Sequence, residues 1–91
     1  MMQAAESLCR NNLDHMNEYS KKEIIWRERE ILTRVLIAES IQRIEDYQGK
    51  DAELFHGENR NLGRLLKARD YCRDQEEEAR ARKDYLEFLF L

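Results

Sequence analysis

The 91-residue sequence contains no proline and only three glycines. Proline and glycine are the strongest breakers of regular structure, so a stretch without either can stay helical throughout. Two such stretches exist, residues 1–48 and residues 64–91, and every glycine lies between them. We therefore predict an all-α fold in which two long helical arms meet at a central joint.

Long hydrophobic runs are also missing, since no apolar stretch approaches the roughly 20 residues that a membrane span requires. The N-terminus lacks a basic region followed by an apolar core, and Glu6 and Asp14 are untypical of a transit peptide. We expect a soluble intracellular protein of the cytoplasm with no membrane span.

Cysteine is scarce, and neither Cys9 nor Cys72 has a histidine at metal-ligand spacing. A disulfide framework or a zinc site needs more ligands than this, so we expect neither a metal nor another cofactor. Both cysteines fall on apolar helical faces, which predicts small buried side chains in a reducing compartment. A single disulfide between the two arms is the alternative, because an antiparallel hairpin brings the arms together.

Charge of one sign is lacking too: 16 basic and 19 acidic residues give a net charge of −3. Such a balance creates no strong field for nucleic acid or anionic membrane. Charged residues nevertheless make up 38% of the chain, against about one quarter in typical globular domains, which favours elongated, exposed helices.

One short basic row begins at Arg60 and continues through four more positions of the second arm. The other members are Arg64, Lys67, Arg69 and Arg73. Acidic residues interleave with this row, and no helix-turn-helix or RNA-binding pattern accompanies it. A solvated face of mixed charge is the favoured interpretation, and a nucleic-acid-binding hairpin is the alternative.

Residues 21–47 form the strongest predicted helix of the chain. Acid-then-base pairs four residues apart support it at Glu23/Arg27, Glu30/Arg34 and Glu39/Arg43. Just upstream, Ser20 to Glu23 matches a capping box, which marks the start of a helix. A second helix beginning at Ser20 and one continuous helix over residues 2–47 both fit this pattern.

The apolar residues of this helix occupy three sides instead of one. Ile24, Ile31, Val35 and Ala38 share one line, Ile25, Leu32 and Leu36 a second, and Ile37, Ile41 and Ile44 lie near Trp26 on a third. A helix that is apolar most of the way round needs neighbours on more than one side. We therefore expect self-association or a helical partner at Ile24, Ile31, Val35, Leu36 and Ile37.

The joint is predicted over residues 48–60. Gly49 suits a helix C-cap, and Asp51 suits the N-cap of the element that follows. Residues 55–63 contain two glycines and two asparagines, which favours a bent turn or a short helix there.

The second arm, residues 61–90, carries a thin coiled-coil seam. Its positions seven apart are Leu65, Cys72, Ala79 and Leu86, with Ala68 and Leu89 at the companion positions. The chain ends in its most hydrophobic stretch, residues 85–91. We expect this tail to be a docking element with Leu86, Phe88, Leu89 and Phe90 as its contact residues. The antiparallel geometry favours packing beside residues 5–16, and a second copy or another protein is the alternative.

Motifs for catalysis are absent from the sequence: it has no phosphate loop, dinucleotide fingerprint, HExxH or calcium loop, and His15 and His56 belong to no recognisable triad. We therefore expect no small-molecule substrate.

One stretch, residues 8–27, resembles the first helix of the all-helical chorismate mutases, which carries two arginines seventeen residues apart around an apolar-Asp-x-apolar-Asp pattern. The matching positions are Arg10, Leu13-Asp14, Met16-Asn17 and Arg27. The family's lysine falls on Ala38, and Asp51-Ala52-Glu53-Leu54 stands where the family has Asp-x-x-Arg-Glu. The resemblance implies intertwined helices from two chains and an enzyme that clamps a dianionic substrate.

Taken together, the sequence predicts a single helical domain over residues 1–91: an antiparallel hairpin or coiled-coil-like bundle of two to three long helices, completed by oligomerisation, most simply as a homodimer. The predicted function is non-enzymatic protein–protein interaction by helix packing, as an adaptor, assembly factor, small chaperone or structural subunit. The mutase-like enzyme and the nucleic-acid-binding hairpin are the alternatives.

Overall fold

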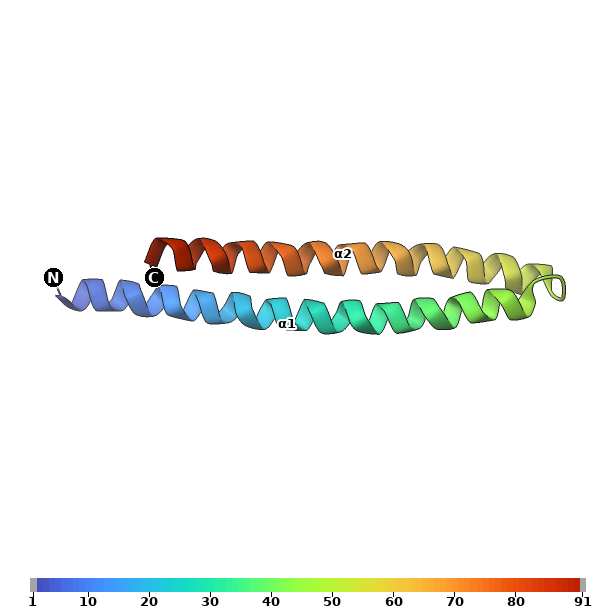
Figure 1. The fold of residues 1–91 in the computed structure, drawn as a ribbon, viewed down its shortest axis with the longest axis horizontal. Coiled ribbons are helices and arrows are strands. Elements are labelled where there is room, and N and C mark those ends of the chain that lie inside the picture. Colours follow the sequence, from blue (N-terminus) through green and yellow to red (C-terminus); the bar gives the residue numbers. More distant parts are fainter. Residues whose placement is uncertain (1, 91) are drawn as a thin grey trace.

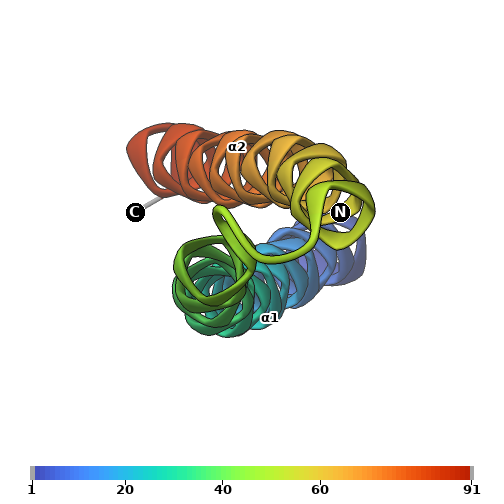
Figure 2. The same cartoon turned by 90° about the vertical axis from the view of Figure 1, so that its right-hand side faces the viewer.

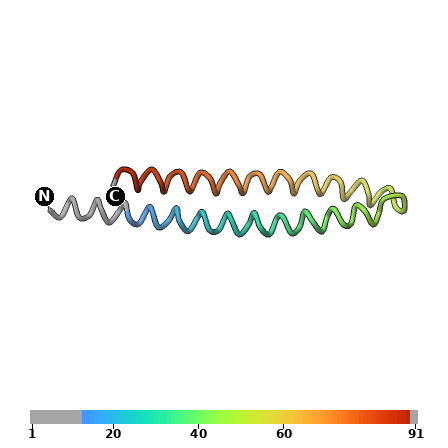
Figure 3. The backbone as a smooth tube through the Cα atoms, in the orientation of Figure 1, coloured from blue at the N-terminus to red at the C-terminus, as the bar shows by residue number. Residues whose placement is uncertain are grey.

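The structure, a computed structural model, describes the backbone of residues 2–90 and the side chains of residues 13–89. Within this range the chain forms two α-helices, α1 (Met2–Tyr47) and α2 (Ala52–Phe90), and no strand. The helices run antiparallel along their whole shared length (Figure 1), and the backbone reverses direction once (Figure 3). The molecule measures 74 × 15 × 13 Å. The predicted all-α antiparallel hairpin is confirmed.

Helix α1 is continuous through Ser20, which decides between the two arrangements that the sequence allowed. The Glu23 side chain does not close a capping box: its carboxylate accepts hydrogen bonds from Arg27 on α1 and from Arg80 and Lys83 on α2. With no proline or glycine before Gly49, nothing in the backbone interrupts the helix.

The turn between the helices occupies residues 48–51 and uses both predicted caps. Gly49 has a φ of +75°, the left-handed conformation that favours glycine at a helix end. The N–H groups of Lys50 and Asp51 donate to the carbonyl oxygen of Tyr47, at 3.0 and 3.1 Å. Asp51 then caps α2, because its Oδ1 accepts a hydrogen bond of 3.0 Å from the N–H of Leu54.

The predicted bend over residues 55–63 is wrong, and the joint ends at residue 51 instead of 60, because α2 begins at Ala52 and continues without a break. Gly57 and Gly63 each cost a helix about 1 kcal/mol relative to alanine. Contacts with α1 compensate, since Glu58 bonds to Ser40 and Arg43 directly beside the turn. Tertiary packing commonly outweighs helix propensity in this way.

The two helices meet along a narrow seam, and seen from the end they cross at a shallow angle (Figure 2). Only four hydrophobic side chains are buried among the described residues: Met16, Ile37, Cys72 and Ala79. Five polar or charged residues are buried beside them: Glu23, Glu30, Thr33, Ser40 and Glu76. The seam is therefore at least as polar as it is apolar.

On α2 the predicted seven-residue line is confirmed, since Cys72 and Ala79 are buried and Leu65 and Leu86 partly buried. Its predicted companions are wrong, because Ala68 and Leu89 are exposed. Residues three positions before each seam residue share its side of the helix here, whereas Ala68 and Leu89 lie three positions after Leu65 and Leu86. The companion line is Leu62, Arg69, Glu76 and Lys83.

The hairpin buries little of its own surface. Its accessible area is 7139 Å², whereas a compact monomer of this mass exposes about 5,600 Å². Two helices have one shared face, so each leaves the rest of its circumference uncovered. Most of the large aliphatic residues of α1 among the described side chains lie on that uncovered part.

We predict opposite effects of alanine at two glycines. Gly63→Ala should stabilise the hairpin by about 1 kcal/mol, because Gly63 lies in a helix with open space where a Cβ would stand. Gly49→Ala should destabilise it by about 1–2 kcal/mol, because its φ of +75° strains an L residue. Thermal melts followed by circular dichroism measure both, and a lower melting temperature for Gly63→Ala would contradict this account of α2.

Candidate interaction surface

The middle of the seam is an ion network that joins both helices. Glu23 is only 8% exposed, and its Oε1 lies 3.1 Å from Arg27 Nη2 and 3.1 Å from Arg80 Nε, while Oε2 lies 3.3 Å from Lys83 Nζ. Burial raises the pKa of Glu23, but the hydrogen bonds from Arg80 and Lys83 outweigh it and leave that pKa below its usual value. The carboxylate is therefore held in its charged form.

Glu76 is the second buried carboxylate of this network and mirrors Glu23 from the other helix. Its Oε1 accepts hydrogen bonds from Arg27 Nε at 3.0 Å and from Arg80 Nη2 at 3.1 Å. Arg27 and Arg80 thus each bridge two carboxylates, one on each helix. Paired charges with several hydrogen bonds each are the condition under which buried carboxylates are tolerated.

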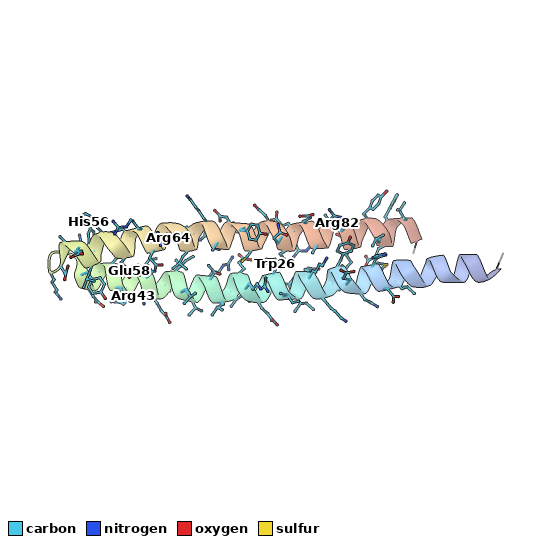
Figure 4. The ribbon with its side chains drawn as sticks, turned by 180° about the vertical axis from the view of Figure 1, so that it is seen from behind. Trp26, Arg43, His56, Glu58, Arg64 and Arg82 are labelled. Carbon is cyan, nitrogen blue, oxygen red and sulfur yellow. The ribbon has the colours of Figure 1, made fainter. Side chains whose placement is uncertain are left out.

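Two further clusters extend this pattern toward the turn. Glu30, 7% exposed, lies 2.7 Å from Arg34 Nη2 and 3.5 Å from Arg73 Nε of α2. Trp26 marks the middle of the hairpin (Figure 4), where it meets Tyr71 edge-to-face with ring centroids 5.5 Å apart. Charged contacts across the helices therefore recur on both sides of this aromatic pair.

The cluster nearest the turn is centred on Glu58, which faces Arg43 across the helices (Figure 4). Its Oε1 lies 3.1 Å from Arg43 Nη2 and accepts hydrogen bonds from Ser40 Oγ at 2.7 Å and Asn61 Nδ2 at 3.0 Å. These bonds, that from Arg43 foremost, lower the pKa of Glu58 to about 2, and the same contact raises the pKa of Arg43. Arg43 therefore bonds to α2 instead of to Glu39 as the sequence predicted.

On the other side of α1 lies a cluster of large aliphatic side chains that α2 does not cover, which we call the outward face. Its members, with their exposed fractions, are Ile24 (53%), Ile25 (44%), Ile31 (55%), Leu32 (60%), Val35 (50%) and Leu36 (39%). Together they expose on the order of 600 Å², the upper end of what the largest apolar patch of a soluble monomer shows. Such a patch is typical of a docking surface.

The outward face lies opposite the seam because of the helical period. Glu23, Glu30 and Ile37 are buried at seven-residue spacing and face α2. Each next residue is rotated by about 100°, so the positions one and two residues after Glu23 and Glu30 turn away from α2. Those positions are Ile24 and Ile25, then Ile31 and Leu32.

Of the five interface residues predicted on α1, four belong to the outward face: Ile24, Ile31, Val35 and Leu36. Ile37 does not, because it is 8% exposed and packs in the seam against α2. The structure adds Ile25 and Leu32, which the sequence analysis placed on a helix line of their own without assigning them a partner.

One of the four predicted contact residues of the C-terminal tail is partly buried. Leu86 is partly buried and lines a shallow groove with His15, Tyr19 and Tyr85 at the open end of the hairpin. Phe88 is 85% exposed and Leu89 47% exposed, so the hairpin itself does not cover them. Phe90 and the side chains of residues 5–12 lie outside the part of the chain whose side chains are described.

The residues that suggested other functions are placed as follows. Arg27, which carries part of the mutase resemblance, is engaged by Glu23 and Glu76 in the seam, and Arg10 lies outside the described side chains. Of the basic row, Arg73 pairs with Glu30 and Arg69 with Asp70. The remaining three, Arg60, Arg64 and Lys67, are exposed.

Cys72 is a buried free thiol, as predicted, and the alternative disulfide involves Cys9, whose side chain is not described. No group of three or more histidine, cysteine or acidic side chains able to hold a metal ion occurs among the residues that the structure describes. In the same part of the chain, neither helix has a segment apolar enough to cross a membrane. Comparison with protein families, characterised proteins and solved structures found no match to this chain.

The buried carboxylates were not predicted from the sequence, where Glu23/Arg27 and Glu30/Arg34 were interpreted only as pairs that support the helix. The signal that identifies them is their register. Met16, Glu23, Glu30, Ile37 and Ile44 follow one another at seven-residue spacing, so two acids occupy a line that otherwise carries apolar residues. Acids in such a line indicate cations on the facing helix.

We predict that Glu58 contributes to the acid sensitivity of the hairpin. A carboxyl whose pKa is lowered from 4.5 to about 2 on folding stabilises the fold fully above about pH 4.5, and this contribution is lost as the pH falls to about 2. Glu58→Gln should therefore lower the melting temperature near neutral pH and flatten its fall between these two pH values.

Glu77→Gln is the matched control, because it removes one exposed carboxylate from the same helix outside the ion pairs of the described side chains. Its melting temperature should follow that of the wild type at every pH. Identical acid slopes for Glu58→Gln and the wild type would contradict the assigned role of Glu58.

We also predict that the two ends of the tail contribute unequally to folding. Leu86→Ala should destabilise the hairpin by about 1 kcal/mol, because Leu86 is partly buried against α1. Phe88→Ala should change the free energy of unfolding by less than about 0.5 kcal/mol, because Phe88 is 85% exposed. Urea unfolding monitored by the fluorescence of the single tryptophan, Trp26, compares them, and a larger loss for Phe88→Ala would show that Phe88 is covered in solution.

Proposed function

We propose that this protein is a non-enzymatic helical interaction module that binds helices through the outward face of α1. The observation that carries this proposal is the exposure of six large aliphatic side chains on one side of a rigid helix. Among the described residues, only four hydrophobic side chains are buried in the seam, whereas six large aliphatic side chains are exposed on the outward face.

The energetics favour covering this face. Completing the burial of each half-exposed aliphatic side chain contributes about 1 kcal/mol, so the six together contribute on the order of 6 kcal/mol before the partner's own apolar surface is added. Association costs an estimated 4–15 kcal/mol in lost freedom of motion. A partner that matches the face along its length is therefore bound, whereas one that covers a single turn is not.

The shape of the face favours a helix as the partner. The six residues extend over about 18 Å along α1, at the 1.5 Å rise of an α-helix. They form a convex ridge, and a second helix packs on such a ridge by placing its side chains between the rows. Contacts with α2 order α1 as a continuous helix before a partner arrives, which reduces the entropy lost on binding.

These properties suit an adaptor, an assembly factor, a small chaperone or a structural subunit, all of which act by helix packing. We place this role in the cytoplasm, because the described cysteine, Cys72, is a buried free thiol and a reducing compartment preserves such a group.

The proposal predicts different effects for two aspartate substitutions at positions of equal exposure. Val35 on the outward face and Leu54 at the start of α2 are both 50% exposed. In the isolated hairpin Val35→Asp and Leu54→Asp should each change stability by no more than about 0.5 kcal/mol. Once a partner covers Val35, an unpaired carboxylate there costs several kcal/mol.

Val35→Asp should therefore abolish association, seen by sedimentation velocity of the purified protein and by recovery of partners from a native extract, while Leu54→Asp keeps it. Circular dichroism checks that both variants remain helical. Undiminished association of Val35→Asp would disprove the proposed function.

A further inference from the structure

The two ends of the outward face carry side chains of opposite charge. Lys21 lies three residues before Ile24, the first aliphatic residue of the face, and Glu39 lies three residues after Leu36, the last one. Both are exposed, and neither enters a salt bridge among the side chains of residues 13–89. The face therefore has a basic end and an acidic end, each open to a partner.

We propose that the occupant of the outward face is a second copy of this chain, packed antiparallel through α1 about a two-fold axis near residue 30. This inference rests on the proposed function and names its partner. A two-fold axis at residue 30 exchanges Ile24 with Leu36 and Lys21 with Glu39. The pair of helices thus brings each Lys21 beside Glu39 of the partner copy, twice, on either side of the shared aliphatic centre.

The parallel arrangement is disfavoured by the same charges. It sets Lys21 against Lys21 and Glu39 against Glu39, so both ends repel. Glu28 is the exposed acid within the face, and antiparallel packing separates its two copies along the axis, whereas parallel packing places them side by side. The face is complementary to itself in one orientation, which is the requirement for a two-fold symmetric interface.

The area is sufficient for a stable pair. About 600 Å² from each copy gives about 1,200 Å² in total from the aliphatic residues alone, which reaches the lower limit of specific protein interfaces. Because the seam and the outward face lie on opposite sides of α1, the assembly is a layer of four helices with the two α1 helices in the middle. The far side of α2, which carries Lys67 and Glu77, stays uncovered.

The test exchanges the charges at the two ends. Lys21→Glu alone, or Glu39→Lys alone, turns both end contacts of the antiparallel pair into like-charge contacts, so each variant should dimerise about ten-fold more weakly than the wild type. A one-to-one mixture of the two variants restores opposite charges at both contacts. Its apparent affinity in sedimentation equilibrium at low salt should return to within about three-fold of the wild type.

Lys67→Glu and Glu77→Lys are the matched controls, since they make the same charge changes on the uncovered side of α2. Both should dimerise like the wild type. Weakened dimers in these controls would overturn the proposed layer, and unchanged affinity in Lys21→Glu and Glu39→Lys would overturn the antiparallel orientation.

A purified wild type that stays monomeric, while Val35→Asp still loses a different partner from a native extract, would overturn the second copy as occupant and leave the proposed function standing. If Val35→Asp keeps both self-association and partner binding, the second copy as occupant and the proposed function are both disproved.

Discussion

The pairing of the two helices depends on three carboxylates that are buried where the helices meet. Glu23, Glu30 and Glu76 are each no more than 8% exposed, and a carboxylate in that position is stable only when cations reach it. The cations come largely from the opposite helix: Arg80 and Lys83 reach Glu23, Arg73 reaches Glu30, and Arg27 reaches Glu76. A slip of α2 along α1 separates Arg73 from Glu30 and Glu76 from Arg27, so these pairs favour the observed register of the hairpin.

Carboxylates in the seam lower the stability of the hairpin relative to an apolar seam. The arginines that bridge the helices keep about half of their surface in water, where ion pairs contribute little net free energy. Each acid in the seam also occupies a position where a buried aliphatic side chain would contribute hydrophobic stabilisation. The polar seam therefore supplies specificity of pairing more than stability, and the aliphatic residues that form a core in other helical proteins lie on the outward face of α1.

Much of the fold followed from the sequence, and the reasons are local. The absence of proline and the caps at Gly49 and Asp51 sufficed to predict two helices and one turn. Residues 55–63 were predicted incorrectly, because the contacts of Glu58 with Ser40 and Arg43 that support the helix there join positions 15 to 18 residues apart. The sequence showed apolar residues on three sides of α1. It did not show which side faces α2, because that orientation depends on the ion pairs that the buried carboxylates form with cations of the other helix.

The seam and the outward face respond to different forces, which couples folding to assembly. Salt screens the half-exposed ion pairs of the seam, whereas burial of the outward face depends on the hydrophobic effect, which excluded salts such as sulfate strengthen. A partner that binds the outward face of the folded hairpin would stabilise it by mass action. Because the seam joins α1 to α2, a partner bound to α1 would stabilise both helices. In the proposed assembly, association would therefore complete the fold as well as carry out the function.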